Sequence, residues 1–206
     1  MRVLPILFNT EMIRAILDGR KTCTRRLIRK HIENKYLEYD EWVRAVAPPG
    51  STYLREKELY EQYLPYQPGD TLYVRETWCG LPVNEAGHMR GHTIYYYKAD
   101  GELRPKGWRG TWHPSIHMPK EAARIWLKVT DVRVERLQEI TPQGAWKEGA
   151  RCSCLHPVPD CAGNKTAFVN IWNGTIKKSD LDRYGWDANP FVWVVSFERC
   201  EKPEVN

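Results

Sequence analysis

The sequence lacks the features that mark several common classes of protein. It has no apolar run near the roughly 20 residues of a membrane-spanning helix, and its apolar start, MRVLPILFNT, is too short for a secretory signal. It also lacks the Gly-x4-Gly-Lys phosphate loop, the dinucleotide-binding glycine fingerprint and the Gly-x-Ser-x-Gly nucleophile elbow. We therefore expect a cytoplasmic protein without membrane contact that does not use the common nucleotide-binding or hydrolase machinery.

Charge of one sign is not in large excess either. The 206 residues include 31 Lys and Arg against 26 Asp and Glu, which permits a polyanionic partner but falls short of the clustered excess of dedicated DNA-binding proteins. Phenylalanine is scarce at four, whereas nine Trp and eleven Tyr offer rings that can stack on bases as well as pack a core. The length fits one domain with insertions.

A short helix is predicted near the N-terminus, and a basic stretch follows it at once. Asn9 or Thr10 can cap this helix, its apolar residues recur at helical spacing, and Gly19 supplies the left-handed residue that ends it. The stretch GRKTCTRR comes next, with two threonines and a cysteine among its basic residues. It is a solvated basic patch, a nucleic-acid surface or an active site.

A half-buried strand is predicted in PGDTLYVRETW. Alternation places the even-numbered residues from Leu72 to Trp78 on one face, which puts the carboxylate of Glu76 on the apolar side. A buried charge is costly unless it is paired. We therefore expect Glu76 to pair with a basic residue, Lys21 or an arginine of residues 20–26.

Strands dominate the rest of the chain. TIYYYKAD is a further strand, and ARIWLKVTDVRVERL alternates until its parity slips at Thr130 and Asp131, which predicts a bulge or bend of the kind that small closed barrels use. NPFVWVVSFER is apolar on both faces, which predicts a central strand. EYDEWVRAVA and YLREKELYEQYL look like helices of a peripheral insertion.

Four stretches together resemble one known family: ILDGRKTCTRR, PGDTLYVRETW, TDVRVERLQEITPQGAWKEG and ANPFVWVVSFER. In this order the sequence resembles the ASCH family, the PUA-like domains related to the activating signal cointegrator homology domain, and specifically its longer versions in phages and prophages. The resemblance implies an α+β fold, a PUA-like mixed β-barrel with flanking helices. It also implies a single domain over residues 1–200 with insertions at about 28–66, 79–117 and 150–165, followed by a tail at 201–206.

The resemblance further implies a candidate catalytic set. Small bacterial ASCH proteins include amidohydrolases that remove the acetyl group from N-acetylcytidine with a lysine base, a threonine nucleophile and a glutamate proton donor. Their GRKT-x-T segment is matched here, and the family's spacing from a helix-starting threonine to the glutamate is matched by Thr141 and Glu148. Carried over, Lys21 is the base, Thr24 the nucleophile and Glu148 the acid, and this chemistry requires no cofactor.

The alternative is binding without turnover, which we favour because the family motif is wider than the amidohydrolase chemistry. In that case the protein binds RNA or a modified nucleoside in a basic cleft, with arginines on phosphates and aromatic rings on bases. A third hypothesis is a phage accessory or regulatory protein without catalysis. The candidate ligand-binding residues are Arg20, Arg25, Arg26, Arg75, Glu76 and Trp78.

The stretch CSCLHPVPDC gathers thiols and an imidazole in a short loop. In a reducing compartment such a set indicates a metal or free thiols before disulfides, and zinc accepts these ligands. The alternatives are a structural zinc site and a reduced, flexible loop. The candidate ligands are Cys152, Cys154, His156 and Cys161.

Overall fold

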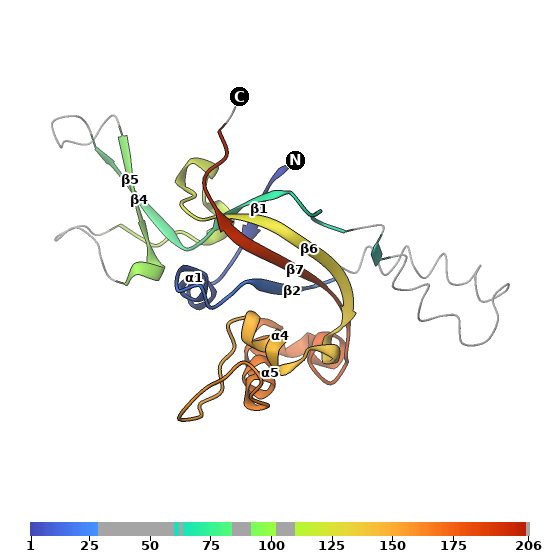
Figure 1. Ribbon diagram of the computed structural model, residues 1–206. Helices are drawn as coiled ribbons and strands as arrows, with labels where there is room; N and C mark the ends of the chain where they lie inside the picture. The colour runs from blue at the N-terminus through green and yellow to red at the C-terminus, as the bar shows by residue number, and fades with distance from the viewer. Residues whose placement is uncertain (29–59, 62–63, 84–91, 102–109, 205–206) are drawn as a thin grey trace. The chain divides into compact units, whose positions relative to one another are not determined.

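The computed structural model describes residues 1–28, 60–61, 64–83, 92–101 and 110–204, and it has an α+β fold (Figure 1). The two helices expected between residues 28 and 66 fall largely outside these residues. No helix in the described ranges is long and apolar enough to cross a membrane.

A mixed five-stranded sheet has the order β1 (Val3–Leu7), β3 (Thr71–Arg75), β6 (Trp126–Arg136), β7 (Phe191–Cys200), β2 (Cys23–Leu27).

The predicted closed barrel is wrong for the described strands, because their sheet is open. β1 pairs in parallel with β3, β2 pairs antiparallel with β7, and β1 and β2 are the two ends of the strand order. Closure would require these two edge strands to pair with each other. The α+β class and the mixed sheet are as predicted, whereas the barrel is not.

The chain divides into two compact units, and the long strands β6 and β7 contribute residues to both. The first unit consists of residues 1–20, 69–128 and 198–206. In it β3 pairs with β1 and with the start of β6, and a separate hairpin is formed by β4 (Trp78–Val83) and β5 (His92–Tyr97).

The helix predicted near the N-terminus is confirmed as α1 (Thr10–Leu17) in the first unit. The side chain of Asn9 caps it by accepting a hydrogen bond from the Met12 amide at 2.9 Å, and Ile13 and Ile16 are buried. Gly19 ends the turn with φ +70°, a left-handed conformation that favours glycine.

The second unit consists of residues 21–68 and 129–197. Here β2 runs antiparallel to β7, with Thr24 opposite Val195 and Arg26 opposite Trp193. The helices of this unit are α4 (Pro142–Lys147), α5 (Gly163–Thr175) and α6 (Leu181–Tyr184). α4 and α5 cover one face of the β2–β7 pair, because Val192 and Val194 pack into one apolar cluster with their side chains (Figure 1).

The opposite face of the β2–β7 pair carries a second apolar cluster, built around Trp193, Phe191 and Ile28. Strand alternation therefore assigns side chains of β2 to two different environments. Cys23 and Arg25 share the face covered by α4 and α5, whereas Thr24 and Arg26 share the other.

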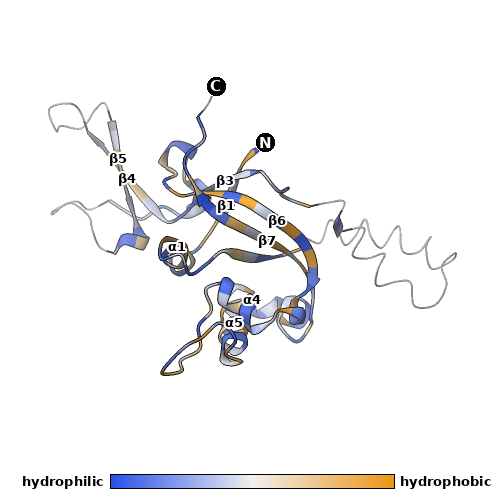
Figure 2. Cartoon of the chain, viewed as in Figure 1, coloured by the Kyte–Doolittle hydropathy of each residue, from blue (hydrophilic) through white to orange (hydrophobic). Residues whose placement is uncertain are grey.

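The parity slip predicted in β6 is visible in its exposure. Val129 and Val134 are buried, and the consecutive residues Thr130 and Asp131 between them are both exposed. Figure 2 shows hydrophilic and hydrophobic segments alternating along this strand. The central position predicted for the last strand is confirmed, because β7 lies between β6 and β2 and is buried from Phe191 to Val195.

Candidate functional site

Lys21 and Glu148 meet in the second unit, where the basic stretch passes the end of helix α4. Thr141 caps the start of α4 by accepting a hydrogen bond from the Gly144 amide, and Glu148 is the residue that caps its end. Lys21 and Glu148 form an isolated antiparallel bridge. The Lys21 Nζ donates to the Glu148 carboxylate at 2.6 Å and to the Glu148 carbonyl at 3.0 Å. The structure therefore brings together two of the three residues that the resemblance assigns to the catalytic set.

Arg25 extends this pair into a chain of alternating charges, which we call the ion-pair chain. Its guanidinium donates to the second carboxylate oxygen of Glu148 at 3.3 Å and to Glu135 at 3.0 Å. Arg133 then bonds Glu135 at 2.5 Å and Asp131 at 2.8 Å. The full sequence of charges is Lys21, Glu148, Arg25, Glu135, Arg133, Asp131.

The ion-pair chain is buried at one end and solvated at the other. The side chains of Lys21, Arg25 and Glu148 are 1%, 3% and 6% exposed, whereas that of Asp131 is 52% exposed. We call these three buried residues the inner cluster. Interactions between its charges are much stronger than those at the solvated end, because water and salt screen it least.

Two side chains of β2 that lie near the inner cluster are poor nucleophiles for it. Burial, with a smaller effect of the Glu148 charge, raises the pKa of Cys23 to about 12, so this residue stays a thiol near neutral pH. Thr24 is buried, and it lies on the opposite face of β2 from Arg25. The amidohydrolase assignment requires Lys21 and Thr24 to converge, whereas strand alternation separates Thr24 from the side chains that reach α4.

The arginines expected to contact phosphate are engaged with the protein itself. Arg20 bonds Asp18 at the exposed end of α1, and Arg75 donates to the carbonyls of Met118 and Ile116. Burial lowers the pKa of Arg26. Among the predicted aromatic platforms, Trp78 packs against the rings of Tyr95 and His113 in the first unit.

Glu76 is buried as predicted, but the prediction of its partner is wrong. Its side chain is 1% exposed, and it accepts hydrogen bonds from Arg124 at 3.0 and 3.1 Å rather than from Lys21 or residues 20–26. Arg124 also bonds Asp100, and its guanidinium lies 3.9 Å from the ring centre of Tyr97. Glu76 directly follows β3, and it lies in the first unit together with Arg124.

Glu76 should make the stability of the protein depend on pH. Burial raises the pKa of Glu76 above its ordinary value of 4.5, against the lowering effect of Arg124. The folded state then holds this proton more tightly than the unfolded state, so the free energy of unfolding falls as pH rises from about 4.5 through the raised pKa. We expect Glu76→Gln, measured by urea unfolding, to remove this decline. If Glu76→Gln shows the same pH dependence as the wild type, the decline in stability does not come from Glu76.

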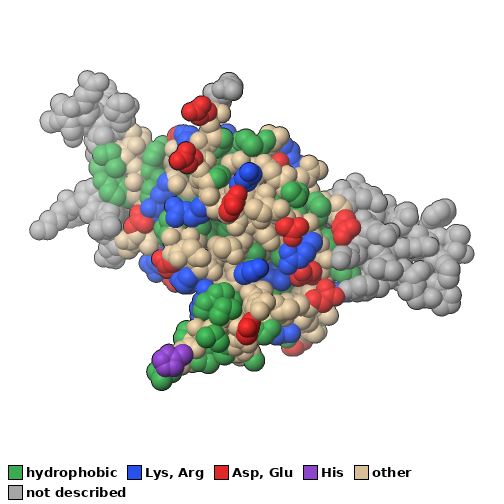
Figure 3. All heavy atoms as spheres, in the orientation of Figure 1, with side chains coloured by type: hydrophobic (Ala, Val, Ile, Leu, Met, Phe, Trp, Pro, Cys, Tyr) green, Lys and Arg blue, Asp and Glu red, His purple; other side chains and the backbone are tan. Residues whose placement is uncertain are grey.

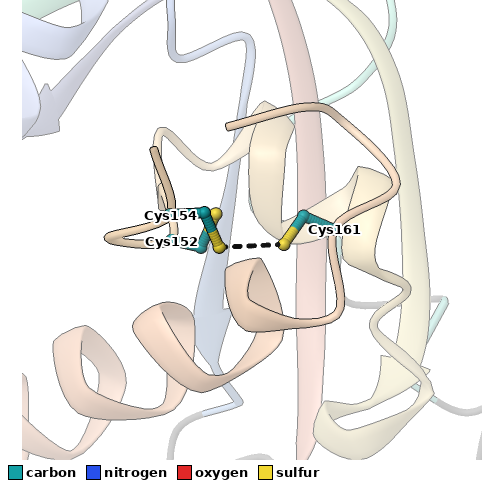
Figure 4. A group of neighbouring side chains, drawn as sticks. All are labelled: Cys152, Cys154 and Cys161. Carbon is teal, nitrogen blue, oxygen red and sulfur yellow. Dashed lines mark hydrogen bonds between the residues drawn. The ribbon is translucent and has the colours of Figure 1, made fainter. Parts of the chain in front are cut away.

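Three cysteine side chains converge in the loop between α4 and α5, and we call them the cysteine cluster. The Sγ atoms of Cys152, Cys154 and Cys161 all lie within 4.8 Å of one another, and those of Cys154 and Cys161 are 3.5 Å apart (Figure 4). Such a group could hold a metal ion. His156, predicted as the fourth ligand, is exposed and is not part of this group.

Sequence reasoning missed the outer half of the ion-pair chain. Asp131, Arg133 and Glu135 alternate along β6, and this period of two places them on one face of the strand. The alternating signs of their charges were therefore a readable signal. Arg124, which pairs with Glu76, gave no such signal because it precedes β6 in an irregular segment.

Comparisons with known proteins found two similar solved structures. One is an ASCH domain from Lactobacillus crispatus, with 12% identity over 96% of this chain and 79% of that chain at a TM-score of 0.41. The other is a DUF984 protein from Enterococcus faecalis, with 10% identity over 97% of this chain and 76% of that chain at the same TM-score. No protein-family model and no curated protein matches the sequence. By its own strands and helices, the chain is an α+β protein with a mixed, open sheet.

Proposed function

We propose that the protein is an ASCH-type module that binds a modified nucleoside or an unpaired RNA base at the inner cluster. The observation that carries this proposal is the carboxylate of Glu148, which lies between the side chains of Lys21 and Arg25. The three groups present hydrogen-bond donors on both sides of an acceptor. The edge of a nucleobase carries donors and acceptors side by side, so the two patterns are complementary.

The same geometry favours a base over a phosphate as the recognised group. Each cation of the inner cluster contacts a carboxylate, and the second partner of Arg25 is another carboxylate, Glu135. A phosphate approaching Lys21 or Arg25 would also approach Glu148, and like charges repel. Figure 3 agrees on the face that it shows, where acidic and basic side chains are interspersed rather than gathered in one basic patch.

Binding at this site exchanges existing contacts for new ones. The inner cluster is nearly inaccessible, so a base must replace part of the Lys21 and Glu148 pairing. Net gains from such exchanges are small, about 0.5 to 1.5 kcal/mol for each hydrogen bond. We therefore expect modest affinity and a strong dependence on Glu148 itself.

Calorimetric titration with N-acetylcytidine tests the proposal. We expect the wild-type protein to bind this nucleoside, and Glu148→Gln to weaken binding at least about tenfold, because the amide is neutral and no longer accepts at both oxygens. Asp182→Asn is the matched control, since it removes one acidic charge from an exposed position on α6. Equal affinity in all three proteins would place binding elsewhere.

A second candidate, amidohydrolase activity, is favoured by the 2.6 Å contact between an amine and a carboxylate. Transfer of one proton from the Lys21 ammonium to Glu148 would give the free base and the acid that the reaction needs. In the scheme carried over from the family, the Thr24 hydroxyl attacks the acetyl carbon and gives its proton to Lys21, while Glu148 gives its proton to the exocyclic nitrogen, so that the amide bond breaks and cytidine leaves. Water then hydrolyses the acyl-threonine ester to acetate and restores the threonine hydroxyl. Because Thr24 lies on the opposite face of β2 from Arg25, this route requires a local rearrangement of the strand.

Acetate release in the same titration samples decides between the two candidates. Hydrolysis that is lost in Lys21→Met and in Thr24→Val, but kept in Thr22→Val, would support the enzyme. Thr22 is the matched control because it is exposed and lies between the two residues. Binding without acetate release would leave recognition as the function.

A further inference from the structure

The cysteine cluster has the spacing of a metal site. Zinc–sulfur bonds of about 2.3 Å in a tetrahedral site place sulfur atoms about 3.8 Å apart. The Cys154 and Cys161 sulfurs are 3.5 Å apart, and the third sulfur lies within 4.8 Å of both. Figure 4 shows the three side chains pointing toward one another across the loop. Three thiols this close together could hold one metal ion.

The loop backbone is held in this shape by a buried side chain that makes three hydrogen bonds. Asn164, in the first turn of α5, is fully buried. Its Oδ1 accepts from the Cys152 amide at 2.9 Å, and its Nδ2 donates to the carbonyls of Val158 and Pro159 at 2.8 and 3.0 Å. Asn164 thus ties the start of the loop at Cys152 to its middle at Val158 and Pro159 without using the thiols.

Gly163 is a second sign that the sequence brings the start of α5 close to Cys152. A Cβ atom at this position would lie 2.7 Å from the Cβ of Cys152, closer than real Cβ contacts. Only glycine therefore lets the start of α5 pack against the first cysteine. The Cys161 amide also donates to the Val158 carbonyl at 3.1 Å, which closes the turn that carries the third thiol.

We propose that Cys152, Cys154 and Cys161 bind one zinc ion as thiolates, with a water molecule as the fourth ligand. Three thiolates from one short loop suit zinc, a borderline-soft ion that prefers sulfur and tetrahedral geometry. Among the described residues, no His, Asp or Glu joins the three sulfurs, so the protein supplies three ligands here. Binding releases the thiol protons and transfers no electrons.

The proposed ion would fix the end of α4 against the start of α5. Residues 149–151 join Glu148 to Cys152, and within this link the Ala150 amide donates to the Ala145 carbonyl at 3.0 Å. Phe168 of α5 packs with Ala145 and Ala150, and its ring lies 5.8 Å from the guanidinium of Arg25. Zinc is therefore expected to hold Glu148 and Arg25 in place without touching either residue.

Metal analysis of the full chain, purified under reducing conditions without chelator, tests the site. We expect about one zinc per chain, and less than about a tenth in Cys154→Ser and in Cys161→Ser. Cys200→Ser should keep its zinc, because Cys200 is not one of the three grouped thiols. Replacement of zinc by Co²⁺ should give a thiolate-to-metal charge-transfer band in the wild type and in Cys200→Ser only.

Other outcomes would overturn the proposal. One is a wild-type protein that stays below about a tenth of an equivalent after incubation with Zn²⁺, with its three thiols titrating freely. Another is a disulfide between Cys154 and Cys161 in freshly isolated protein. If a serine variant fails to fold by circular dichroism, the cobalt spectrum of the wild type decides alone, and absence of the band contradicts the site.

Discussion

Glu148→Ala should lower the free energy of unfolding by about 3 to 5 kcal/mol, because it removes the anion of a buried ion pair. Lys21 is then left as a buried charge without its carboxylate, while Arg25 keeps Glu135. Loss of one partner of a buried pair is costly, because the remaining charge stays desolvated and has lost a close opposite charge. Lys21 is therefore the main source of the expected loss.

Urea unfolding at neutral pH measures this effect. Asp182→Asn, at an exposed position, should change stability by less than about 0.5 kcal/mol. Glu148→Gln should fall between the two, because the amide oxygen still accepts from Lys21 but carries no charge. A loss below about 1 kcal/mol in Glu148→Ala would show that the inner cluster is open to water and weakly coupled.

The double variant Lys21→Met/Glu148→Leu should recover at least half of the stability that Glu148→Ala loses. Apolar side chains of similar size can replace a buried ion pair with little cost, since the desolvation of two charges is removed together with their attraction. A double-mutant cycle built from the single variants Lys21→Met and Glu148→Leu and their double variant should therefore give a large interaction energy. We expect several kcal/mol, as for residues in direct contact. Near-additive effects would contradict a direct buried pair.

The same double variant separates stability from function. It keeps the fold but has neither the donor nor the acceptor of the proposed site, so N-acetylcytidine binding should fall below detection. The single control Asp182→Asn should bind as the wild type does. Retained binding in a stable double variant would show that the inner cluster serves structure only.

The sequence predicted local features of the fold well and its closure poorly. Asn9, Gly19 and the alternation that buries Glu76 follow from near neighbours in the chain, and each is found in the structure. Whether the sheet closes depends on the pairing of its edge strands β1 and β2, and alternation along a strand carries no information about that pairing. The barrel was inferred from the resemblance and from one parity slip.

The candidate site shows the same division. Glu148 and Lys21 were named together only through the resemblance, because no local pattern links residues so far apart in the sequence. The partner of Glu76 was missed, since any of several basic residues satisfied the requirement for a buried counter-ion. The alternating charges that include Glu135 were readable along β6, but their link to Glu148 depends on Arg25, which lies far from them in the sequence.

The most direct test of base recognition compares N-acetylcytidine with its 5′-monophosphate at about 50 and 200 mM salt. A site that reads the base through Lys21, Glu148 and Arg25 should bind both ligands with affinities within about threefold, nearly unchanged by salt. A phosphate-binding surface instead loses affinity steeply as the salt concentration rises, because salt screens the attraction between basic side chains and the phosphate. Binding of the monophosphate alone, with a strong loss at the higher salt, would contradict the account.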